Sequence, residues 1–431
     1  MSSIKCLICK KETEEFAMLG PNQSVCNDCI KKIQNISVDN RERFWDSVSA
    51  ENKAEKGSLT KHYEPVTSIN YDEMKKFRPS IIKQKLDDYI VGQESAKKIL
   101  SVAAYNHMKR TELNDKDIQK SNVLLIGPTG SGKTLLAKTL GRILNLPVAI
   151  VPATNLTEAG YVGDDVSTVV ERLLQAADGN VERAERGIIF IDEIDKLVSN
   201  GNGAIREVGG KGVQQALLPI LEGTIVNVAA PNGSNTGIGV TAKLEIDTSN
   251  ILFICGGAFP DVEAIIKKRI SGGTSIGFTH SQKESTTVDE KNLLLQVKTD
   301  DLKTFGLIPE FLGRLPVVAP LEELSIDALK EILTNPKDSI ISQYKKLFSV
   351  DGVCLTFEDE ALTYIATKAV EKGIGARSLR GMLEEILLEL MYAIPDDMNL
   401  GEVIITYDYV RGEGEPDYIS RVKLEQSYSM L

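Results

Sequence analysis

The chain contains the octapeptide Gly127-Pro128-Thr129-Gly130-Ser131-Gly132-Lys133-Thr134, which has the spacing G-x-x-x-x-G-K-[ST] of a phosphate-binding loop. Before it, the apolar run 122–126 predicts a buried parallel strand, and after it the run 135–140 predicts the first turns of a helix. Glycines let the backbone N–H groups turn toward a phosphate chain, and the N-terminus of the helix adds partial positive charge. A glycine-rich turn without a ligand is the alternative, and the flanking strand and helix favour phosphate binding.

A second apolar run, 187–191, ends in the acidic pair Asp192-Glu193. Acids at the carboxyl end of a buried parallel strand lie at the edge of the sheet where α/β proteins bind ligands. We therefore expect Lys133 to reach the β- and γ-phosphates of ATP and Thr134 to hold Mg²⁺. Asp192 would hold the same Mg²⁺ through water, and Glu193 would orient the attacking water and take its proton. The alternative, a solvated strand end, is disfavoured by the phosphate-binding loop earlier in the chain.

The composition limits the possible partners. The chain has 431 residues, enough for about three domains, and carries a net charge of −11. This negative charge argues against broad binding to nucleic acids or to anionic membranes. The first residues lack the apolar segment of a signal peptide, and ~18 consecutive apolar residues occur nowhere, so we expect no membrane span. We expect a cytoplasmic protein without nucleic-acid or membrane partners.

Six cysteines occur, and four of them lie within the first 29 residues as two C-x₂-C pairs. Each pair can aim two thiolates at one point, and two pairs complete a closed tetrahedral Zn²⁺ site, which is structural rather than catalytic. We expect a zinc-binding module over 1–45 whose folding the metal drives. A redox pair or unliganded thiols are the alternatives. The expected ligands are Cys6, Cys9, Cys26 and Cys29. The other two, Cys255 and Cys354, each lie in an apolar run and are predicted to be small core residues.

Strand-like and helix-like segments alternate from residue 121 to about residue 320, which predicts an α/β domain with a parallel sheet covered on both faces. Pro79 is predicted to begin a helix ahead of this core. Further on, apolar residues at helical spacing predict a small, mainly helical domain; they are Leu379, Leu383, Ile386, Leu387 and Leu390. The expected organisation is a zinc-binding module over 1–45, a flexible linker over 46–75, an α/β ATPase domain over 76–320 and a helical domain over 321–431.

Glycine- and serine-rich stretches interrupt the α/β domain and are predicted to be long loops, which in compact domains are often functional. One carries Tyr161 and Val162 between two glycines, and another carries the apolar triplet Ile276-Gly277-Phe278 between polar arms. Ordinary surface connections, or apolar tips that fold back onto the domain, are the alternatives. The four predicted loops are 157–165, 199–210, 228–244 and 270–300.

Taken together, the motifs resemble the ClpX family of zinc-module AAA+ protein unfoldases, which work with the ClpP peptidase. The resemblance extends from the four N-terminal cysteines to Arg377 and the helix predicted after it. The phosphate-binding loop alone is shared by many NTPases, whereas the complete set is specific. The set also includes the stretches 86–93, 160–163, 213–218, 255–259, 276–278, 313–316 and 375–377.

The resemblance implies an AAA+ P-loop NTPase fold and a homohexamer, a ring of six subunits with ATP and Mg²⁺ at the interfaces. Arg314 would be the finger that reaches the γ-phosphate bound by the neighbouring subunit, and Arg377 would be the sensor that contacts nucleotide from the small domain. A surface salt bridge is the alternative for each arginine. Together with Lys133 and Glu193, they form the expected catalytic set. The expected nucleotide contacts are Ile90 and Val91, which would flank the adenine, and Gly127, Pro128, Thr129, Gly130, Ser131, Gly132, Lys133, Thr134, Leu135, Asp192 and Arg377.

The resemblance also implies ATP-dependent unfolding of protein substrates and their translocation into ClpP. Tyr161 and Val162 would line the substrate pore, and Ile276, Gly277 and Phe278 would dock on a ClpP-type peptidase. Unfolded or tagged proteins and adaptors would be the other partners. A chaperone that remodels complexes without a peptidase is the alternative. A nucleic-acid motor is less favoured, because a loop that grips DNA should be basic rather than aromatic.

The chain departs from the family in the loop 229–243. Many family members carry an Arg-Lys-His triad there, which surrounds the pore entrance and attracts carboxylate-ended peptide tags. In this chain Lys243 is the one basic residue of that loop, so the resemblance gives no expectation that such tags are captured. Near Gly256, at the position of the family's first sensor, no polar side chain occurs, and no residue is assigned to that role.

Overall fold

The structure is a computed structural model that describes residues 74–113, 118–157, 164–198, 207–229, 243–271 and 290–422, with the short N-terminal segments 4–5, 12–13, 16–20, 23–26 and 28–29. The chain divides into two units, Met1–Thr67 and Ser68–Leu431. Residues 46–73 of the predicted linker and the tips of all four predicted loops lie outside the described residues.

The described part of the first unit consists of short antiparallel strand pairs. β1 (Ile4–Lys5) pairs with β2 (Glu12–Thr13), and β3 (Phe16–Gly20) pairs with β4 (Gln23–Cys26). Cys26, the last residue of β4, is half-buried, and Cys29 is buried. Cys6 and Cys9 lie outside the described residues. Two of the four predicted zinc ligands are therefore placed at and just after the end of one strand.

The second unit is built on a five-stranded parallel sheet, which confirms the predicted α/β class. Its strands are β5 (Val123–Ile126), β6 (Val148–Pro152), β9 (Ile188–Asp192), β12 (Leu252–Gly257) and β13 (Val317–Pro320), in the order β13-β5-β12-β9-β6. All neighbouring pairs are parallel, so the carboxyl ends of the strands lie at one edge. The register aligns Gly257 with Ile126 and Cys255 with Ile191. This carboxyl edge therefore gathers the residues that follow β5, β9 and β12.

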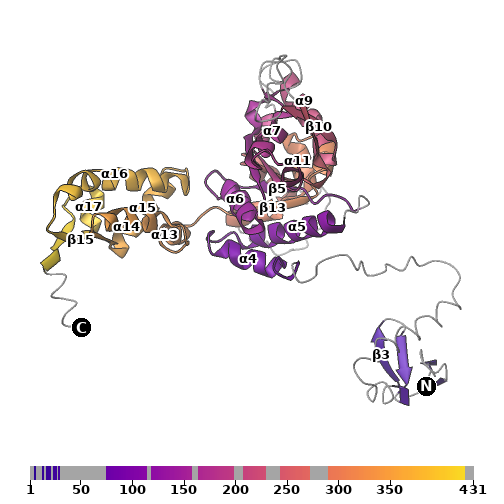
Figure 1. Ribbon diagram of the computed structural model, residues 1–431, viewed down its shortest axis with the longest axis horizontal. Coiled ribbons are helices and arrows are strands. Elements are labelled where there is room, and N and C mark those ends of the chain that lie inside the picture. The colour runs from indigo at the N-terminus through magenta and orange to yellow at the C-terminus, as the bar shows by residue number, and fades with distance from the viewer. Residues whose placement is uncertain are drawn as a thin grey trace, which may run out of the picture. The chain divides into compact units, whose positions relative to one another are not determined.

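Side chains alternate along these strands into two separate cores, because successive residues of a strand point to opposite faces. Leu125 and Phe190 belong to one core, and Leu124 and Ile191 belong to the other. Helices cover both faces, as Figure 1 shows for α4 and α5 on one side of β5 and β13 and for α7 and α9 on the other.

The first face is covered by α4 (Pro79–Asp87), α5 (Glu94–Leu113) and α6 (Lys133–Leu144). The other face is covered by α7 (Thr168–Ala176), α8 (Val181–Glu185), α9 (Glu207–Glu222), α10 (Val262–Ser271), α11 (Thr299–Phe305) and α12 (Pro309–Gly313). Pro79 begins α4, as predicted, because its missing N–H and fixed φ suit the first turn of a helix. Within the described ranges, no helix combines the length and the apolar content needed to cross a membrane.

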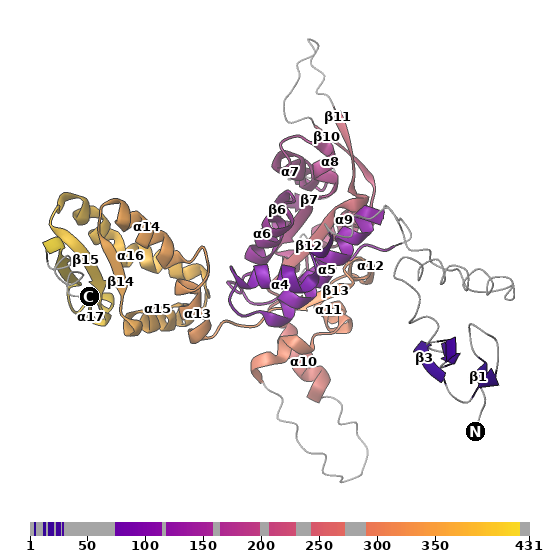
Figure 2. The same ribbon diagram turned by 60° about the horizontal axis from the view of Figure 1, so that its bottom comes forward.

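Shorter elements complete the α/β domain. β10 (Ile225–Ala229) and β11 (Lys243–Asp247) form an antiparallel pair that projects from the domain (Figure 2). β7 (Leu156–Thr157) pairs in parallel with β8 (Asp164–Asp165). The 3₁₀ helices are η1 (Ala153–Asn155), η2 (Ile194–Leu197), η3 (Thr248–Asn250) and η4 (Glu290–Gln296).

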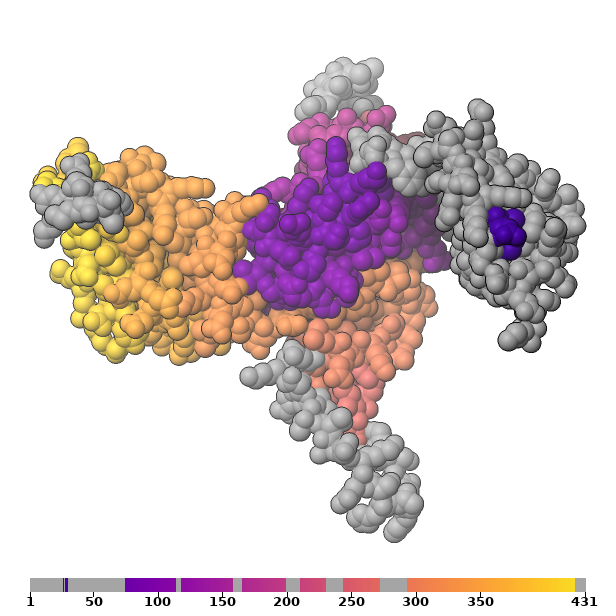
Figure 3. Space-filling view, turned by 90° about the horizontal axis from the view of Figure 1, so that it is seen from below, coloured from indigo at the N-terminus to yellow at the C-terminus, as the bar shows by residue number. Residues whose placement is uncertain are grey.

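A smaller domain with its own core follows β13. Its helices are α13 (Ile326–Thr334), α14 (Ile340–Val350), α15 (Asp359–Glu371), α16 (Arg377–Ala393), η5 (Ile394–Asp396) and α17 (Tyr407–Arg411), and its sheet consists of β14 (Cys354–Phe357), β15 (Leu400–Ile405) and β16 (Asp417–Ser420). The four leucines of the predicted helical face in α16 are buried, and Ile386 is partly buried. Lys337 Nζ lies 2.6 Å from Asp88 Oδ2, just after α4. Figure 3 shows the surface of the small domain in orange and yellow.

All four predicted loops are shorter than expected. The loop 157–165 begins at the end of β7 and ends in β8. The predicted end of the loop 199–210 is wrong, because α9 begins at Glu207. The loop 228–244 begins and ends in β10 and β11, whose pairing supplies backbone hydrogen bonds that the Gly- and Thr-rich composition did not indicate. The loop 270–300 is wrong at both ends, since α10 extends to Ser271 and helical structure resumes at Glu290.

The two single cysteines differ in burial. Cys255 is fully buried in β12, as predicted. The prediction for Cys354 is wrong, because this residue is exposed at the start of β14. Strand alternation turns the next residue, Leu355, inward instead, where it is 1% exposed.

Basic side chains gather in the interior around the C-terminal half of α5. His107 is 3% exposed, and burial, with the nearby charges of Lys120 and Arg110, lowers its pKa to about 3. Lys120 Nζ donates to Thr248 O at 2.9 Å and lies 4.6 Å from the ring centroid of Phe253. Burial lowers the pKa of Lys120 to about 7. The folded protein therefore keeps His107 neutral at pH values where an exposed histidine takes a proton.

We predict that part of the stability is lost as the pH falls from about 7 to 5. In the unfolded chain His107 takes a proton below its ordinary pKa of about 6.5, whereas in the folded chain it does so only near pH 3. The contribution of the neutral histidine to stability is therefore complete above pH 6.5 and is lost as the pH falls from 6.5 toward 3. At pH 5 the expected loss in the free energy of unfolding is about 2 kcal/mol. His107→Gln cannot titrate and should lack this loss. Urea unfolding midpoints of both proteins at the two pH values measure it; an identical pH dependence would contradict the buried neutral histidine.

Candidate active site

The loop between β5 and α6 forms a cradle of backbone groups. Gly130 and Gly132 have φ angles of 82° and 101°, in the left-handed region that favours glycine. Gly127 N donates to Gly257 O at 3.2 Å, which ties the beginning of the loop to the end of β12. The loop leads into α6, whose first residue is Lys133. Since the N–H groups of a first helical turn have no partners within the helix, they add to the cradle.

The Lys133 side chain is buried inside this loop. Its ammonium donates to Gly127 O at 2.7 Å and to Pro128 O at 2.9 Å, and only 9% of the residue is exposed. Burial lowers the pKa of Lys133 below its ordinary value, while the Asp192 carboxylate acts in the opposite direction. The Ser131 hydroxyl is also buried and has no hydrogen-bond partner in the described protein. A buried cation and an unpartnered hydroxyl in one loop fit the oxygens of a phosphate chain.

The loop is joined directly to the acidic end of β9. Thr134 Oγ1 donates to Asp192 Oδ2 at 2.8 Å. A hydroxyl and a carboxylate side by side are the hard oxygen ligands that Mg²⁺ prefers. Among the described residues, no group of three or more His, Cys, Asp and Glu side chains gathers as a metal cluster. The pair therefore suits Mg²⁺ held by few protein oxygens together with water and substrate phosphates, which is the usual mode for this ion.

Glu193 follows Asp192 in an unusual backbone conformation. Its φ of 57° and ψ of 36° are left-handed, which is uncommon for a residue with a side chain and clusters at functional sites. The Glu193 N–H donates to Asp192 Oδ1 at 2.9 Å and fixes this carboxylate from the other side. The chain turns sharply into η2, and the Glu193 side chain is left exposed at the carboxyl edge of the sheet. An exposed carboxylate can accept a proton from water.

The last two residues of β12, Gly256 and Gly257, have no space for a side chain. A Cβ atom on Gly256 would lie 2.7 Å from the Phe190 ring, and one on Gly257 would lie 2.8 Å from Asp195 Oδ1. Asp195 is 5% exposed and accepts from Phe259 N at 3.3 Å. The absence of a polar side chain at this position of the sequence therefore has a steric reason. Asp195 was not predicted, since an acid just after an acidic pair gives no separate signal.

The segment expected to flank the adenine is tied to the phosphate-binding loop. Ile90 is buried and Val91 is half-buried. Gln93 Nε2 donates to Ser131 O at 3.3 Å and to Glu322 O at 2.9 Å, and Gln93 Oε1 accepts from Glu322 N at 2.8 Å. Gln93 thereby connects the segment that contains Ile90 and Val91 to the phosphate-binding loop and to Glu322, which follows β13. Gln93 lies in the family stretch 86–93, but the sequence assigns it no role, because a polar residue after Gly92 does not reveal its partners.

Arg377 lies near the phosphate-binding loop. It is the first residue of α16, and its charge contributes to the lowered pKa of Lys133. The chain just before it approaches the loop closely, since a Cβ atom on Gly130 would lie 2.2 Å from Ile374 O. The structure thus brings the start of α16 close to the loop.

Arg314 lies elsewhere. It follows α12, and its side chain is 48% exposed and forms an ion pair with Glu222 at 2.7 Å. Arg314 O accepts from the Asn122 side chain at 3.0 Å, at the residue before β5. Since the phosphate-binding loop follows the other end of β5, Arg314 is held at the opposite edge of the sheet. The structure does not bring it to the loop of its own chain.

The remaining predicted site residues are placed as follows. Leu135 is 48% exposed on the first turn of α6. Tyr161, Val162 and the triplet Ile276-Gly277-Phe278 lie outside the described residues. The chain on either side of Tyr161 is held by the pairing of β7 with β8.

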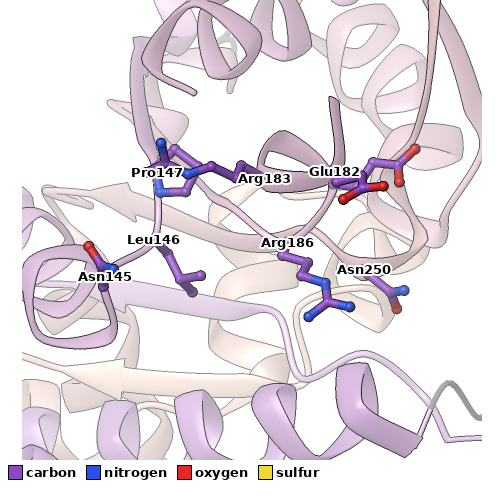
Figure 4. A pocket seen from close by; sticks show the side chains of 8 residues that line it. Asn145, Leu146, Pro147, Glu182, Arg183, Arg186 and Asn250 are labelled. Carbon is purple, nitrogen blue, oxygen red and sulfur yellow. The ribbon is translucent and has the colours of Figure 1, made fainter. Parts of the chain in front are cut away.

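A pocket of about 540 Å³ lies away from these residues. It is lined by Asn145, Leu146, Pro147, Glu182, Arg183, Glu185, Arg186 and Asn250 (Figure 4). These residues precede β6, β9 and β12, so the pocket lies at the amino edge of the sheet. The pocket is therefore distinct from the loop and the acidic pair, which lie at the carboxyl edge.

Comparisons with known proteins agree with this geometry. Residues 118–318 match a family profile described as AAA domain (Cdc48 subfamily), and residues 324–399 match one described as C-terminal, D2-small domain, of ClpB protein. The chain is 42% identical over 428 residues to the ATP-dependent Clp protease ATP-binding subunit ClpX of Bacteroides thetaiotaomicron, covering 97% of this chain and 98% of that protein. It is also 42% identical over 427 residues to the subunit of the same name from Bacteroides fragilis, covering 97% of each chain.

Proposed function

Because the chain belongs to the ClpX family of ATP-dependent Clp protease ATP-binding subunits, we propose that it is an ATP-driven unfoldase that unfolds protein substrates and delivers them to a ClpP-type peptidase. A member of this family is an AAA+ ATPase that uses ATP and Mg²⁺ and works as an oligomer. The observation that best supports the ATPase activity is the hydrogen bond between Thr134 and Asp192, because it joins the phosphate-binding loop to the acidic end of β9.

Binding of ATP would exchange hydrogen bonds inside the loop. Lys133 now donates to Gly127 O and Pro128 O, and its ammonium would turn to the phosphate oxygens of the substrate. The buried Ser131 hydroxyl would gain the partner that it lacks. Since Lys133 is already buried, little further desolvation opposes this exchange.

Hydrolysis would use the residues that follow β9. Thr134 and Asp192 would hold Mg²⁺, which when bound offsets negative charge on the transferring phosphoryl group. Glu193 would take a proton from the water that attacks the γ-phosphorus, as the bond to the oxygen bridging the β- and γ-phosphates breaks. The exposed position of Glu193 next to Asp192 supports this role.

The assembly would be a homohexameric ring. Arg314 is exposed at the edge of the sheet opposite its own loop, which supports a role as the finger acting on ATP bound by a neighbouring subunit. The close approach of Ile374, three residues before Arg377, to Gly130 of the loop supports a sensor contact within the subunit. Ile90 and Val91, tied to the loop through Gln93, would contact the adenine, with Leu135 of α6 beside the nucleotide. A cytoplasmic location stays a prediction.

Replacing Glu193 with Gln should leave ATP binding intact and lower the rate of ATP hydrolysis by about 10²–10⁴, because an amide cannot accept the proton. Glu182→Gln, which changes an exposed glutamate at the amino edge of the sheet, should retain the wild-type rate. Steady-state phosphate release and binding of a fluorescent ATP analogue measure the two properties. Hydrolysis at the normal rate by the Glu193 variant would exclude it as the base.

The N-terminal region would bind one Zn²⁺ through Cys6, Cys9, Cys26 and Cys29. The positions of Cys26, at the end of a strand, and of the buried Cys29 three residues later support a tight turn that aims both thiolates at one metal. The site would be structural, with the metal stabilising a region too small to fold well alone.

Metal analysis of the purified protein should find about one zinc per chain. A zinc-selective chelator, added with Mg²⁺ kept in excess, should unfold residues 1–45 and leave ATP hydrolysis by the second unit intact, because the two regions belong to separate units. Protein purified without chelators that contained no zinc would contradict the proposed site.

Two loops would contact protein partners. Tyr161, with Val162 beside it, would grip the translocating chain, since an aromatic ring packs against any side chain without reading its sequence. Ile276, Gly277 and Phe278 would dock in an apolar cleft of the peptidase. Unfolded or tagged proteins and adaptors would be the other partners.

Phe278→Ser should abolish most peptidase-coupled degradation and leave ATP hydrolysis unchanged. Each docked apolar side chain contributes about 1.5–3 kcal/mol, and copies repeated around a ring add avidity. Thr286→Ser, in the same predicted loop, serves as the control. Loss of both activities would indicate a core role for Phe278, and loss of neither would favour a chaperone that works without the peptidase.

A further inference from the structure

The short helix α12, which leads to Arg314, is held at both ends by buried carboxamide side chains. At its beginning, Gln214 Oε1 accepts a hydrogen bond from Ile308 N at 2.9 Å. At its end, Asn122 Nδ2 donates to Arg314 O at 3.0 Å. Gln214 is fully buried and Asn122 is 1% exposed, so water does not compete for these bonds.

Each carboxamide also binds an element that leads to the active site of the same chain. Gln214 Nε2 donates to Leu197 O at 3.2 Å, at the end of the 3₁₀ helix that follows Glu193. Asn122 directly precedes β5, the strand that ends at the phosphate-binding loop. Its side chain also donates to Leu221 O at 3.3 Å and accepts from Phe253 N of β12 at 3.3 Å. α12 is therefore connected both to the element that follows the acidic pair and to the strand that leads to the phosphate-binding loop.

The chemistry of the partners permits only one orientation of each carboxamide. The two partners of Asn122 Nδ2 are carbonyl oxygens, and the partner of Asn122 Oδ1 is an N–H group. The partners of Gln214 are likewise one carbonyl oxygen and one N–H group. A rotated amide would place like groups against each other, so both side chains act as fixed connectors.

α9 completes the connection between the two ends. A Cβ atom on Gly210 would lie 2.3 Å from Leu197 O, so only a glycine allows the start of α9 to pack so closely on η2. The same helix carries Gln214 in its middle and Glu222 at its end, where Glu222 forms the ion pair with Arg314. Arg314 is thus held through its backbone, through its side chain and through the beginning of its helix.

We propose that Asn122 and Gln214 are positioning residues that fix Arg314 relative to the loop and the acidic pair of its own chain, and that their effect is exerted on the ATP of the neighbouring subunit. The inference rests on the proposed role of Arg314 as a finger. A buried amide whose partners are all in place cannot shift without breaking those bonds. Movement of β5 or η2 is therefore passed to α12, and from there to the next active site of the ring.

The experiment uses full-length protein with Asn122→Ala or Gln214→Met. The first removes the clamp at the end of α12, and the second keeps the length and apolar packing of the side chain without its hydrogen bonds. Alone, each variant should bind a fluorescent ATP analogue as the wild type does and hydrolyse ATP about 10–100-fold more slowly, since a misplaced catalytic group costs rates of this order. Gln215→Ala, an exposed amide on the same helix, serves as the matched control and should hydrolyse ATP normally.

Mixed rings separate an effect on the neighbour from an effect within the chain. Each variant is assembled 1:1 with Glu193→Gln subunits, which lack the base but hold Arg314 normally. A variant subunit beside such a neighbour has an intact loop, an intact base and a well-placed finger. Since about one site in four is of this kind in a random heterologous ring, hydrolysis should recover to about a quarter of the wild-type rate, above the sum of the two parents.

A reference mixture of Arg314→Ala with Glu193→Gln distinguishes the possible failures. Recovery in the reference mixture without recovery in the Asn122 and Gln214 mixtures would overturn the positioning role and leave the finger intact. No recovery in the reference mixture would overturn the finger itself. Normal hydrolysis by both amide variants alone would also overturn the inference, and the two variants are independent should one fail to assemble.

Discussion

The parallel register of β5, β12 and β9 is the constraint on which the active site depends. β5 carries the phosphate-binding loop and β9 carries the acidic pair, yet these strands are not neighbours, and each pairs with β12 between them. The register brings both strand ends to one edge, where Thr134 reaches Asp192 at 2.8 Å. A shift by one residue would exchange the side chains of the two cores, so burial on both faces of the sheet fixes this alignment. The end of β12 carries only glycines there, because a Cβ atom on Gly256 or Gly257 would clash with Phe190 or Asp195.

The same sheet divides the proposed catalytic groups between its two edges. Lys133 and Glu193 belong to the carboxyl edge, whereas Arg314 is held beside the residue that precedes β5. With the proposed role of Arg314, a single chain has an incomplete site, and a ring completes it if the finger of each subunit reaches the next. On this account, hydrolysis in one subunit depends on the internal hydrogen bonds of its neighbour, which provides a physical basis for communication around the ring.

The sheet and the phosphate-binding loop could be predicted because the spacing of apolar runs and glycines within a short stretch of sequence indicates them. Prediction failed where contacts between residues distant in sequence determine the local structure. Glu207 is helical because α9 packs on η2, and Cys354 turns outward because Leu355 occupies the inner position of its strand. No role could be predicted for Asn122 or for Gln214 of the family stretch 213–218, since a polar residue in an apolar run does not reveal its partners, which come from segments far along the chain. The two arginines were identified only through the family resemblance, because nothing local separates them from surface residues.

The central claim is that ATP hydrolysis by this chain drives the unfolding of proteins for a peptidase. The most direct measurement follows the fluorescence of a stably folded fluorescent protein with an unstructured tail, mixed with this chain and a purified ClpP peptidase. The account predicts that fluorescence is lost with ATP, and that it persists with a non-hydrolysable analogue or when either protein is omitted. Loss of fluorescence at the same rate with the analogue, or its persistence with ATP for every tail tested, would contradict the account.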